Sequence, residues 1–250
     1  MPLTFDLPLD KLASYEGTNP RPDDFDEFWD RSLEEMRALD ARLKKTPADF
    51  QAPYARCSHL TFTGVGGARV HAKLLQPADP QPGHPAVVQF HGYSGSSGDW
   101  SDKLPLVALG FTVAALDVRG QGGLSQDVGG QAGASMYGHF IRGLDGPPEG
   151  LLFRHVYLDT AQLAGILMDM DDVDETRVGA AGGSQGGGLC LACAALEPRI
   201  ARAAATFPFL CDYQRVWTMD QDQHAYKELR DYFRHFDPRH ERENEVFTRL

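Results

Sequence analysis

Ser184 stands in a run of small residues, AAGGSQGGG, at positions 180–188. The stretch 182–186 fits G-x-S-x-G, the pattern of a nucleophilic serine held on a sharp turn between a strand and a helix. An apolar strand pattern (RVGAAG) leads into it and an apolar helix pattern (GGLCLACAAL) leads out. Gly182 and Gly186 are expected because a Cβ at either position would clash across the turn. We predict that Ser184 is a nucleophile for acyl transfer.

Two backbone N–H groups are expected to stabilise the oxyanion that this chemistry forms. The N–H of Gln185 lies at the N-terminus of the following helix, where the helix dipole favours negative charge. His91-Gly92-Tyr93 follows the apolar run PAVVQF, and the Tyr93 N–H is the expected second donor. We also considered His91 as a catalytic base, but in triads of this type the histidine comes last in the chain. We therefore expect His91 to orient the loop.

Other interpretations of the glycines and cysteines fit less well. A phosphate-binding P-loop requires a lysine after its glycines, and a dinucleotide-binding turn belongs to the first strand of its unit. Cys190 and Cys193 form C-x-x-C inside the apolar helix pattern, where positions three apart share a face. Two thiols packed in a core explain the pair better than a zinc site, which would need further ligands. We expect no cofactor and no metal.

The apolar runs predict the sheet that positions these residues. Residues 57–63 and 68–75, joined by 64–67, predict an antiparallel hairpin. Continuous apolar runs at 85–92, 111–120, 177–183 and 200–208 alternate with helical patterns near 102–109 and 155–170. Such alternation is typical of a parallel sheet with helices on both faces. The expected fold class is α/β, mostly parallel with an antiparallel N-terminal hairpin.

Three further segments complete the predicted organisation of one domain over residues 1–250. Apolar positions from Phe25 to Leu43 follow helical spacing and predict an N-terminal helical extension over about 20–45. The glycine-rich stretch at about 121–150 predicts an inserted loop, which is long for a compact domain and therefore indicates function or an interface. Residues from about 212 to 250 are charged and helical in pattern.

The composition argues against some partners. The formal net charge is −11, and 42% of the residues are hydrophobic. An acidic protein repels phosphate backbones and anionic lipids, so we expect no nucleic-acid and no membrane partner. The N-terminal residues lack the basic and apolar regions of a signal peptide, so a cytoplasmic location is expected.

Several segments together resemble the acetyl xylan esterase / cephalosporin-C deacetylase family, carbohydrate esterase family 7. They are FHGYSGSSGDW, LDVRGQG and GGSQGG in this order, with PDDFDEFWDRSLEE, RHVYLDTAQLA and TFPFLCDY. The resemblance implies an α/β-hydrolase fold that deacetylates small sugars and cephalosporin C. It assigns Ser184 as nucleophile, the Tyr93 and Gln185 backbones as oxyanion hole, and residues 119–122 as a structural brace. It also implies that Tyr93 contacts the substrate and that the protein forms a homo-oligomer, a ring-like hexamer.

In the family, the acid and the histidine of the triad each follow a late strand of the sheet, and this sequence has no counterpart of those two strands. The remaining candidates follow the sixth strand, in a segment expected to face solvent: Asp212, Asp220, Asp222, Asp231, Asp237, His224, His235 and His240. A substitute triad from this segment is the less favoured interpretation. We expect the chain to lack the last strands of the fold, with the catalytic Asp and His beyond Leu250.

Three functional hypotheses remain open on the residues alone. The first is a serine esterase acting on small acetylated carbohydrates. The second is another α/β-hydrolase, a peptidase or a dienelactone-type hydrolase. The third is a catalytically incomplete chain that acts in binding or assembly. The strained backbone expected at the Ser184 turn argues against this hypothesis, because such strain serves no structural purpose.

Overall fold

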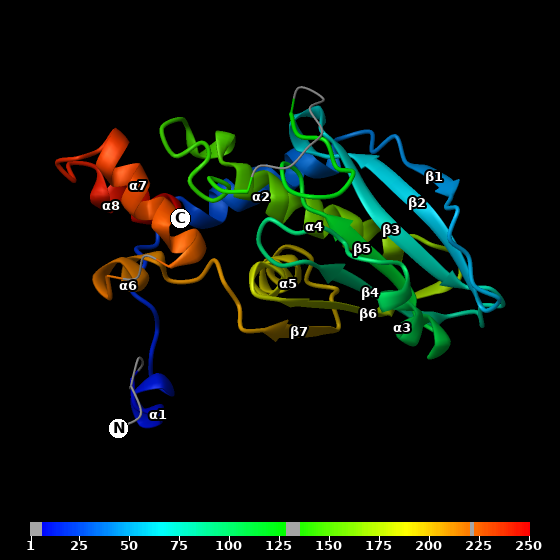
Figure 1. The fold of residues 1–250 in the computed structure, drawn as a ribbon. Coiled ribbons are helices and arrows are strands. Elements are labelled where there is room, and N and C mark those ends of the chain that lie inside the picture. Colours follow the sequence, from blue (N-terminus) through cyan, green and yellow to red (C-terminus); the bar gives the residue numbers. More distant parts are fainter. Residues whose placement is uncertain (1–6, 129–135, 221–222) are drawn as a thin grey trace. The chain divides into compact units, whose positions relative to one another are not determined.

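A mixed sheet forms the frame of the computed structural model, which describes residues 7–128, 136–220 and 223–250 (Figure 1). Within these residues the sheet has seven strands in the order β1-β2-β3-β5-β4-β6-β7. The strands are β1 (Lys44–Pro47), β2 (Ala55–Thr63), β3 (Arg69–Pro77), β4 (His84–Phe90), β5 (Thr112–Asp117), β6 (Val173–Gly183) and β7 (Arg202–Thr206). Strands β5, β4, β6 and β7 are parallel, and β1, β2 and β3 run antiparallel to their neighbours. The predicted α/β class with an antiparallel hairpin is confirmed.

Helices cover both faces of this sheet. The short helices η2 (Ser101–Lys103) and α3 (Leu104–Ala108) lie on one face, and α4 (Leu152–Met168) and α5 (Gln185–Leu196) pack on the other, against β4 and β6 (Figure 1). The predicted connection at 121–150 has no α-helix among its described residues and ends in η3 (Pro148–Gly150). Residues 129–135 of that prediction lie outside the described part.

The N-terminal helix is shorter than predicted. Helix α2 covers Phe25–Arg37, and Arg42 has a φ of 41°, which a continuing helix does not allow. Residues 44–47 instead pair with β2 as the edge strand β1, where they gain backbone hydrogen bonds across the sheet. The prediction of a helix to about residue 45 was therefore wrong. The apolar positions that predicted this helix do pack against the rest of the fold: Trp29, Leu33 and Met36 form a cluster with Leu158 of α4.

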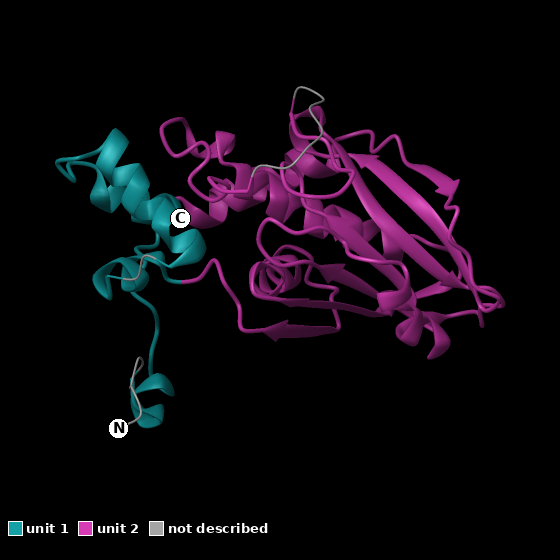
Figure 2. Cartoon of the chain, in the orientation of Figure 1, with its two compact units in different colours: residues 1–22, 212–250 teal, residues 23–211 magenta. Residues whose placement is uncertain are grey.

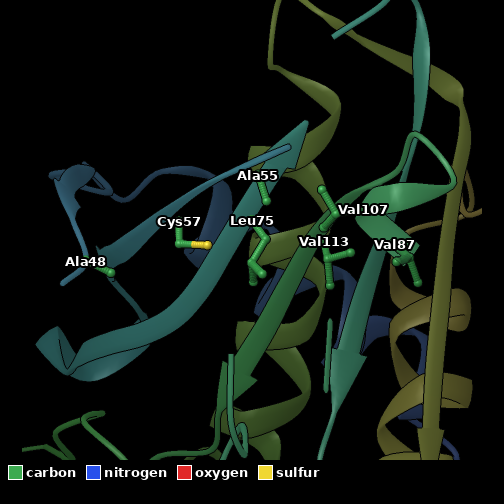
Figure 3. Close-up of a cluster of buried hydrophobic side chains, with 7 residues drawn as sticks. All are labelled: Ala48, Ala55, Cys57, Leu75, Val87, Val107 and Val113. Carbon is green, nitrogen blue, oxygen red and sulfur yellow. The ribbon is translucent and has the colours of Figure 1, made fainter. Parts of the chain in front are cut away.

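The core on the α3 face holds the first strands together. Leu75, Val87 and Val113 come from three neighbouring strands and point to the same side of the sheet, where Val107 of α3 covers them (Figure 3). Each has 8% exposure or less. Burial of apolar surface stabilises the fold by about 25 cal/mol per Å². A shift of one residue would turn these side chains to the other face, so their burial fixes which face of β3, β4 and β5 points inward.

The chain divides into two compact units, shown in Figure 2. The larger unit, Asp23–Cys211, contains the sheet and helices α2 to α5. The smaller unit joins Met1–Pro22 to Asp212–Leu250 and contains α1 (Leu9–Leu12), α6 (Tyr213–Thr218), η4 (His224–Tyr226), α7 (Lys227–Phe236) and α8 (Glu243–Arg249). Inside it Trp217 and Phe233 are ring neighbours, with centroids 4.8 Å apart. A single domain over 1–250 stays a prediction.

Candidate active site

Ser184 occupies the sharp turn between β6 and α5 in a strained backbone conformation. Its φ is 56° and its ψ is −121°, a region that non-glycine residues rarely adopt. Such a conformation persists only when its surroundings over-determine it. The Ser184 N–H donates to the Thr206 carbonyl at 2.9 Å, and the Ser184 carbonyl accepts the N–H of Gly187 and of Phe209, each at 2.9 Å. Neighbours on both sides therefore hold the turn.

Close backbone approach explains why glycine stands two residues before and two residues after Ser184. A Cβ on Gly182 would lie 2.3 Å from the Gly186 carbonyl oxygen. A Cβ on Gly186 would lie 2.1 Å from the Phe90 carbonyl oxygen at the end of β4. No side chain fits at either position, as the G-x-S-x-G pattern predicts.

The Ser184 side chain is exposed. Among residues 7–128, 136–220 and 223–250, no hydrogen bond joins its hydroxyl to another group, so no described histidine or carboxylate is in place to take its proton. Over the same residues, no cluster of three or more His, Cys, Asp or Glu could hold a metal ion.

Gln185 is the first residue of α5 and is fully buried. Its backbone N–H precedes the first hydrogen bond of the helix and therefore has no intrahelical acceptor. Its side-chain amide exchanges hydrogen bonds with the Gln121 amide, at 2.7 and 3.0 Å. The Gln121 oxygen also accepts the Ser94 N–H at 2.8 Å. This pair joins the start of α5 to the loops that follow β4 and β5.

Tyr93 is anchored through its side chain. Its hydroxyl accepts the N–H of His139 at 3.0 Å and of Phe140 at 3.3 Å. Its ring packs edge-on against Phe209, with centroids 5.4 Å apart. These contacts fix the loop after β4 against the segments around residues 139 and 209.

His91 has both ring nitrogens engaged. Nδ1 lies 2.7 Å from the Gly92 carbonyl, and the Val118 N–H donates to Nε2 at 3.0 Å. Nδ1 must therefore carry the proton, and the ring is neutral. Burial lowers the pKa of His91, in agreement with this state. With Nε2 occupied by the Val118 N–H, the ring orients the loop and is not positioned as a base for Ser184.

Arg119 connects the loop after β5 to two other segments of the fold. It is fully buried, and its guanidinium forms a bidentate pair with Asp159 of α4, with distances of 2.7 and 2.5 Å. It also donates to the Val65 carbonyl at 2.8 Å, in the turn between β2 and β3. One side chain thus ties the loop after β5 to a helix and to a hairpin. The sequence singled out residues 119–122 but gave no sign of Asp159 as the partner.

A cavity of about 340 Å³ opens beside the turn on the α3 face. Its lining residues are Gln89, Phe90, His91, Ser96, Ser97, Gly98, Asp102, Lys103, Ala115, Ala181 and Gly182. Ser184, Tyr93 and Gln185 are not among them. The cavity therefore adjoins the Ser184 turn at Gly182, and the Ser184 side chain does not line it.

The polar residues considered for a substitute triad lie in the smaller unit, and five of them have partners there. Asp212 accepts the Thr18 N–H at 3.1 Å, and Asp237 accepts the Glu241 N–H at 3.0 Å. His240 lies 3.0 Å from Glu243. Asp220 and Asp231 pair with Arg230 and Lys227 respectively. Asp222 lies outside the described residues.

Cys190 and Cys193 are buried in α5, and burial raises the pKa of Cys193 to about 12. A thiol with so high a pKa remains protonated at neutral pH, so it is a poor metal ligand and a poor nucleophile. Within the described part of the chain, no helix is both long and apolar enough to span a bilayer.

Replacing Gly186 by alanine tests the close approach at the turn. The new Cβ would overlap the Phe90 carbonyl, so we expect a loss of about 1–3 kcal/mol or more of unfolding free energy. Thermal unfolding followed by circular dichroism measures it. Gly183→Ala is the matched control, since its Cβ would lie 3.8 Å from the nearest atom, the Thr206 carbonyl oxygen. Equal midpoints for the two variants would contradict the steric argument.

His155 of α4 gives a pH dependence of stability. Burial, and then the charges of Arg119 and Arg154, lower its pKa to about 4, from 6.5 for the free group. Between these values the unfolded chain binds more protons than the folded chain, so stability decreases as the pH falls from about 6.5 to about 4. We expect His155→Gln to reduce this slope in urea unfolding at several pH values.

The exposed His235 provides the control for that experiment. His235→Gln should leave the slope between pH 6.5 and 4 as in the parent protein. A His155→Gln variant with an unchanged slope would show that this imidazole is not held neutral by its surroundings.

Comparison with known proteins identifies the family. The chain is 60% identical to acetyl xylan esterase 1 from Thermoanaerobacterium sp. JW/SL YS485, whose crystal structure superposes with a TM-score of 0.93 over 98% of this chain and 77% of that one. The acetyl xylan esterase from Paenibacillus sp. R4 is 30% identical, with a TM-score of 0.89 over 97% of this chain and 77% of that one. The curated acetyl esterase Axe7A of Xylanibacter ruminicola is 25% identical over 201 residues, which span 76% of this chain but only 44% of that protein. The acetyl xylan esterase family model (AXE1) matches residues 1–250, and the chain therefore belongs to the acetyl xylan esterase family.

Proposed function

We propose that the full-length protein is a serine esterase that removes acetyl groups from small acetylated carbohydrates through an acetyl-enzyme on Ser184. The observation that carries this proposal is the strained Ser184 turn, with its side chain exposed and the N-terminus of α5 directly after it. A backbone conformation of this kind costs about 1–3 kcal/mol and is found mostly at functional sites. The family match over residues 1–250 supports the same assignment.

In the proposed reaction the Ser184 oxygen attacks the acetyl carbonyl and its proton passes to a base. The backbone N–H groups of Tyr93 and Gln185 donate to the oxyanion of the tetrahedral intermediate. The intermediate collapses with release of the sugar hydroxyl, which takes the proton, and leaves an acetyl ester on Ser184. Water then attacks this ester and gives a proton to the base. The bond between the acetyl carbon and the Ser184 oxygen breaks, the oxygen takes that proton, and acetate leaves. No step requires a cofactor.

The base and its carboxylate partner are proposed to lie outside these 250 residues. The Ser184 hydroxyl has no hydrogen-bond partner in the described part of the chain, and both nitrogens of the nearby His91 are engaged. The two esterases of known structure extend beyond the match, since the chain covers 77% of each. Residues that correspond to the unmatched part of these two esterases are the proposed source of the base and its carboxylate partner.

Acetylated xylo-oligosaccharides are the proposed substrates, and cephalosporin C, which also carries an acetyl ester, is a proposed second one. The relatives described as acetyl xylan esterases favour the first. Tyr93, whose ring packs against Phe209 beside the turn, is the proposed substrate contact. A cytoplasmic location, without nucleic-acid or membrane partners, stays a prediction of the sequence.

We further propose a homo-oligomer, a hexamer by resemblance to the family. Exposed apolar side chains in the 121–150 connection support an interface there: Leu124, Val128, Met136 and Tyr137 are each 47% exposed or more. Single apolar residues on a surface are ordinary, but several in one connection favour a contact. Sedimentation of the full-length protein measures its mass, and a monomer at micromolar concentration would contradict this part of the proposal.

The Ser184→Ala variant of the full-length protein tests the nucleophile. We expect hydrolysis of p-nitrophenyl acetate to fall by about 10⁴-fold or more, since removal of the serine in a well-studied serine protease costs about 10⁶ in kcat. A fluorophosphonate probe should label the parent protein and leave this variant unlabelled. Ser101→Ala, at another exposed serine, is the control and should keep the parent rate.

Other outcomes would select the competing hypotheses. Faster cleavage of aminoacyl amides than of acetylated xylose would indicate a peptidase. A folded full-length protein in which Ser184 resists the fluorophosphonate would indicate a binding or assembly role. Parent activity in Ser184→Ala would overturn the proposal.

A further inference from the structure

Asp117 is a buried carboxylate on which three hydrogen-bond donors converge. It is the last residue of β5 and is 1% exposed. Its Oδ1 accepts the Ser97 N–H at 2.7 Å, and its Oδ2 accepts the Leu124 N–H at 2.9 Å. Nδ1 of His71, on the neighbouring strand β3, lies 2.7 Å from Oδ2. The donors come from three separate segments of the chain.

The carboxylate is held in its charged form. Burial raises the pKa of Asp117, but the hydrogen bonds from His71, Leu124 and Ser97 outweigh it and keep the pKa well below its usual range. His71 is itself 2% exposed, and its second ring nitrogen, Nε2, lies 2.8 Å from Nδ1 of His59. A buried charge with donors on both oxygens forms a stiff connection, because breaking any one bond leaves a desolvated group unpaired.

The two backbone donors belong to the two loops that border the proposed oxyanion hole. Ser97 follows Tyr93 by four residues in the loop after β4, and Leu124 follows Gln121 by three residues in the loop after β5. The Ser94 N–H joins the same loops a second time, through the Gln121 side chain. Asp117 therefore links the loop of Tyr93 to the loop of Gln121, which in turn contacts Gln185.

The loop after β5 is shaped around the carboxylate. Gly123 has a φ of 95°, and a Cβ there would lie 2.2 Å from the Asp117 carboxyl carbon. Both the conformation and the lack of a side chain are needed for the Leu124 N–H to reach Oδ2.

We propose that Asp117 is a positioning residue for the reaction, one that fixes the backbone of the Tyr93 loop relative to the N-terminus of α5. The inference rests on the proposed esterase function. The hydrogen bonds of the Asp117 carboxylate go to His71, Ser97 and Leu124, and none of them goes to Ser184, Tyr93 or Gln185. Asp117 acts through the loop that presents the Tyr93 N–H, whose position matters most when the oxyanion forms.

The Asp117→Asn variant of the full-length protein tests this role. An amide has one oxygen where the carboxylate has two, so its NH₂ group must face either the Ser97 N–H or the Leu124 N–H, and one loop is released. We expect kcat for p-nitrophenyl acetate to fall about 10–100-fold with KM changed less than about twofold, because only transition-state stabilisation is lost. Rates are expressed per folded molecule.

Thr112→Val is the matched control. Thr112 lies at the other end of β5 and is buried, and its hydroxyl bonds to His84 Nε2 at 2.7 Å. This variant also removes a buried hydrogen bond from the same strand, so it should lower the unfolding midpoint and keep kcat. A parent kcat in Asp117→Asn, or an equal loss of kcat in Thr112→Val, would overturn the positioning role and leave Asp117 a purely structural group.

Two further measurements keep the outcome unambiguous. If Asp117→Asn does not fold, His71→Gln takes its place. This variant weakens the hydrogen bond to Asp117 Oδ2 and should lower kcat with little change in KM. A parent kcat in His71→Gln also overturns the proposal. Ser184→Ala is measured in parallel. Parent activity in Ser184→Ala refutes the esterase mechanism itself, whereas its inactivity together with a parent kcat in Asp117→Asn refutes the Asp117 role alone.

Discussion

The strained backbone of Ser184 is the constraint on which the site depends. A φ of 56° and a ψ of −121° are maintained because the chain is held on both sides of the turn. The strand order places β6 between β4 and β7, so each neighbour contributes. The end of β7 supplies the Thr206 carbonyl, and the segment after it supplies the Phe209 N–H. The end of β4 brings the Phe90 carbonyl against Gly186. The sheet therefore stabilises a conformation that the isolated segment would not adopt.

A short segment that begins at the last residue of β5 supports this turn through three side chains at alternate positions. Asp117 bonds to His71 on β3, Arg119 pairs with Asp159 on α4, and Gln121 exchanges hydrogen bonds with the side chain at the start of α5. All three are 1% exposed or less. Buried polar groups with every partner in place stabilise one arrangement and penalise its alternatives. The segment thus joins the end of β5 to strand β3 and to helices α4 and α5.

Local patterns predicted most of the fold and the nucleophile turn, but not the long-range polar partners. Strands β4 to β7 follow from continuous apolar runs, and Ser184 from its glycines, because those signals lie within a few residues. The edge strand at residues 44–47 was missed, because its polar sequence continued a helical stripe and its stability comes from pairing with β2. His71 and Asp159 lie in a strand and a helix whose patterns do not reveal which buried charge they meet. Such pairs depend on the tertiary arrangement and carry no local signal.

In the proposed serine hydrolase site, the groups that would stabilise the oxyanion are physically separable from the base that would activate Ser184. The strained Ser184 turn, the start of α5 and the anchored Tyr93 loop are all held by groups within the larger unit. None of these interactions uses the proton acceptor that activates the hydroxyl. In a well-studied protease the oxyanion hole and binding alone give about 10³–10⁴-fold acceleration over water. The scaffold can therefore keep this backbone geometry whatever group would activate the serine, because neighbouring strands balance the strain at Ser184.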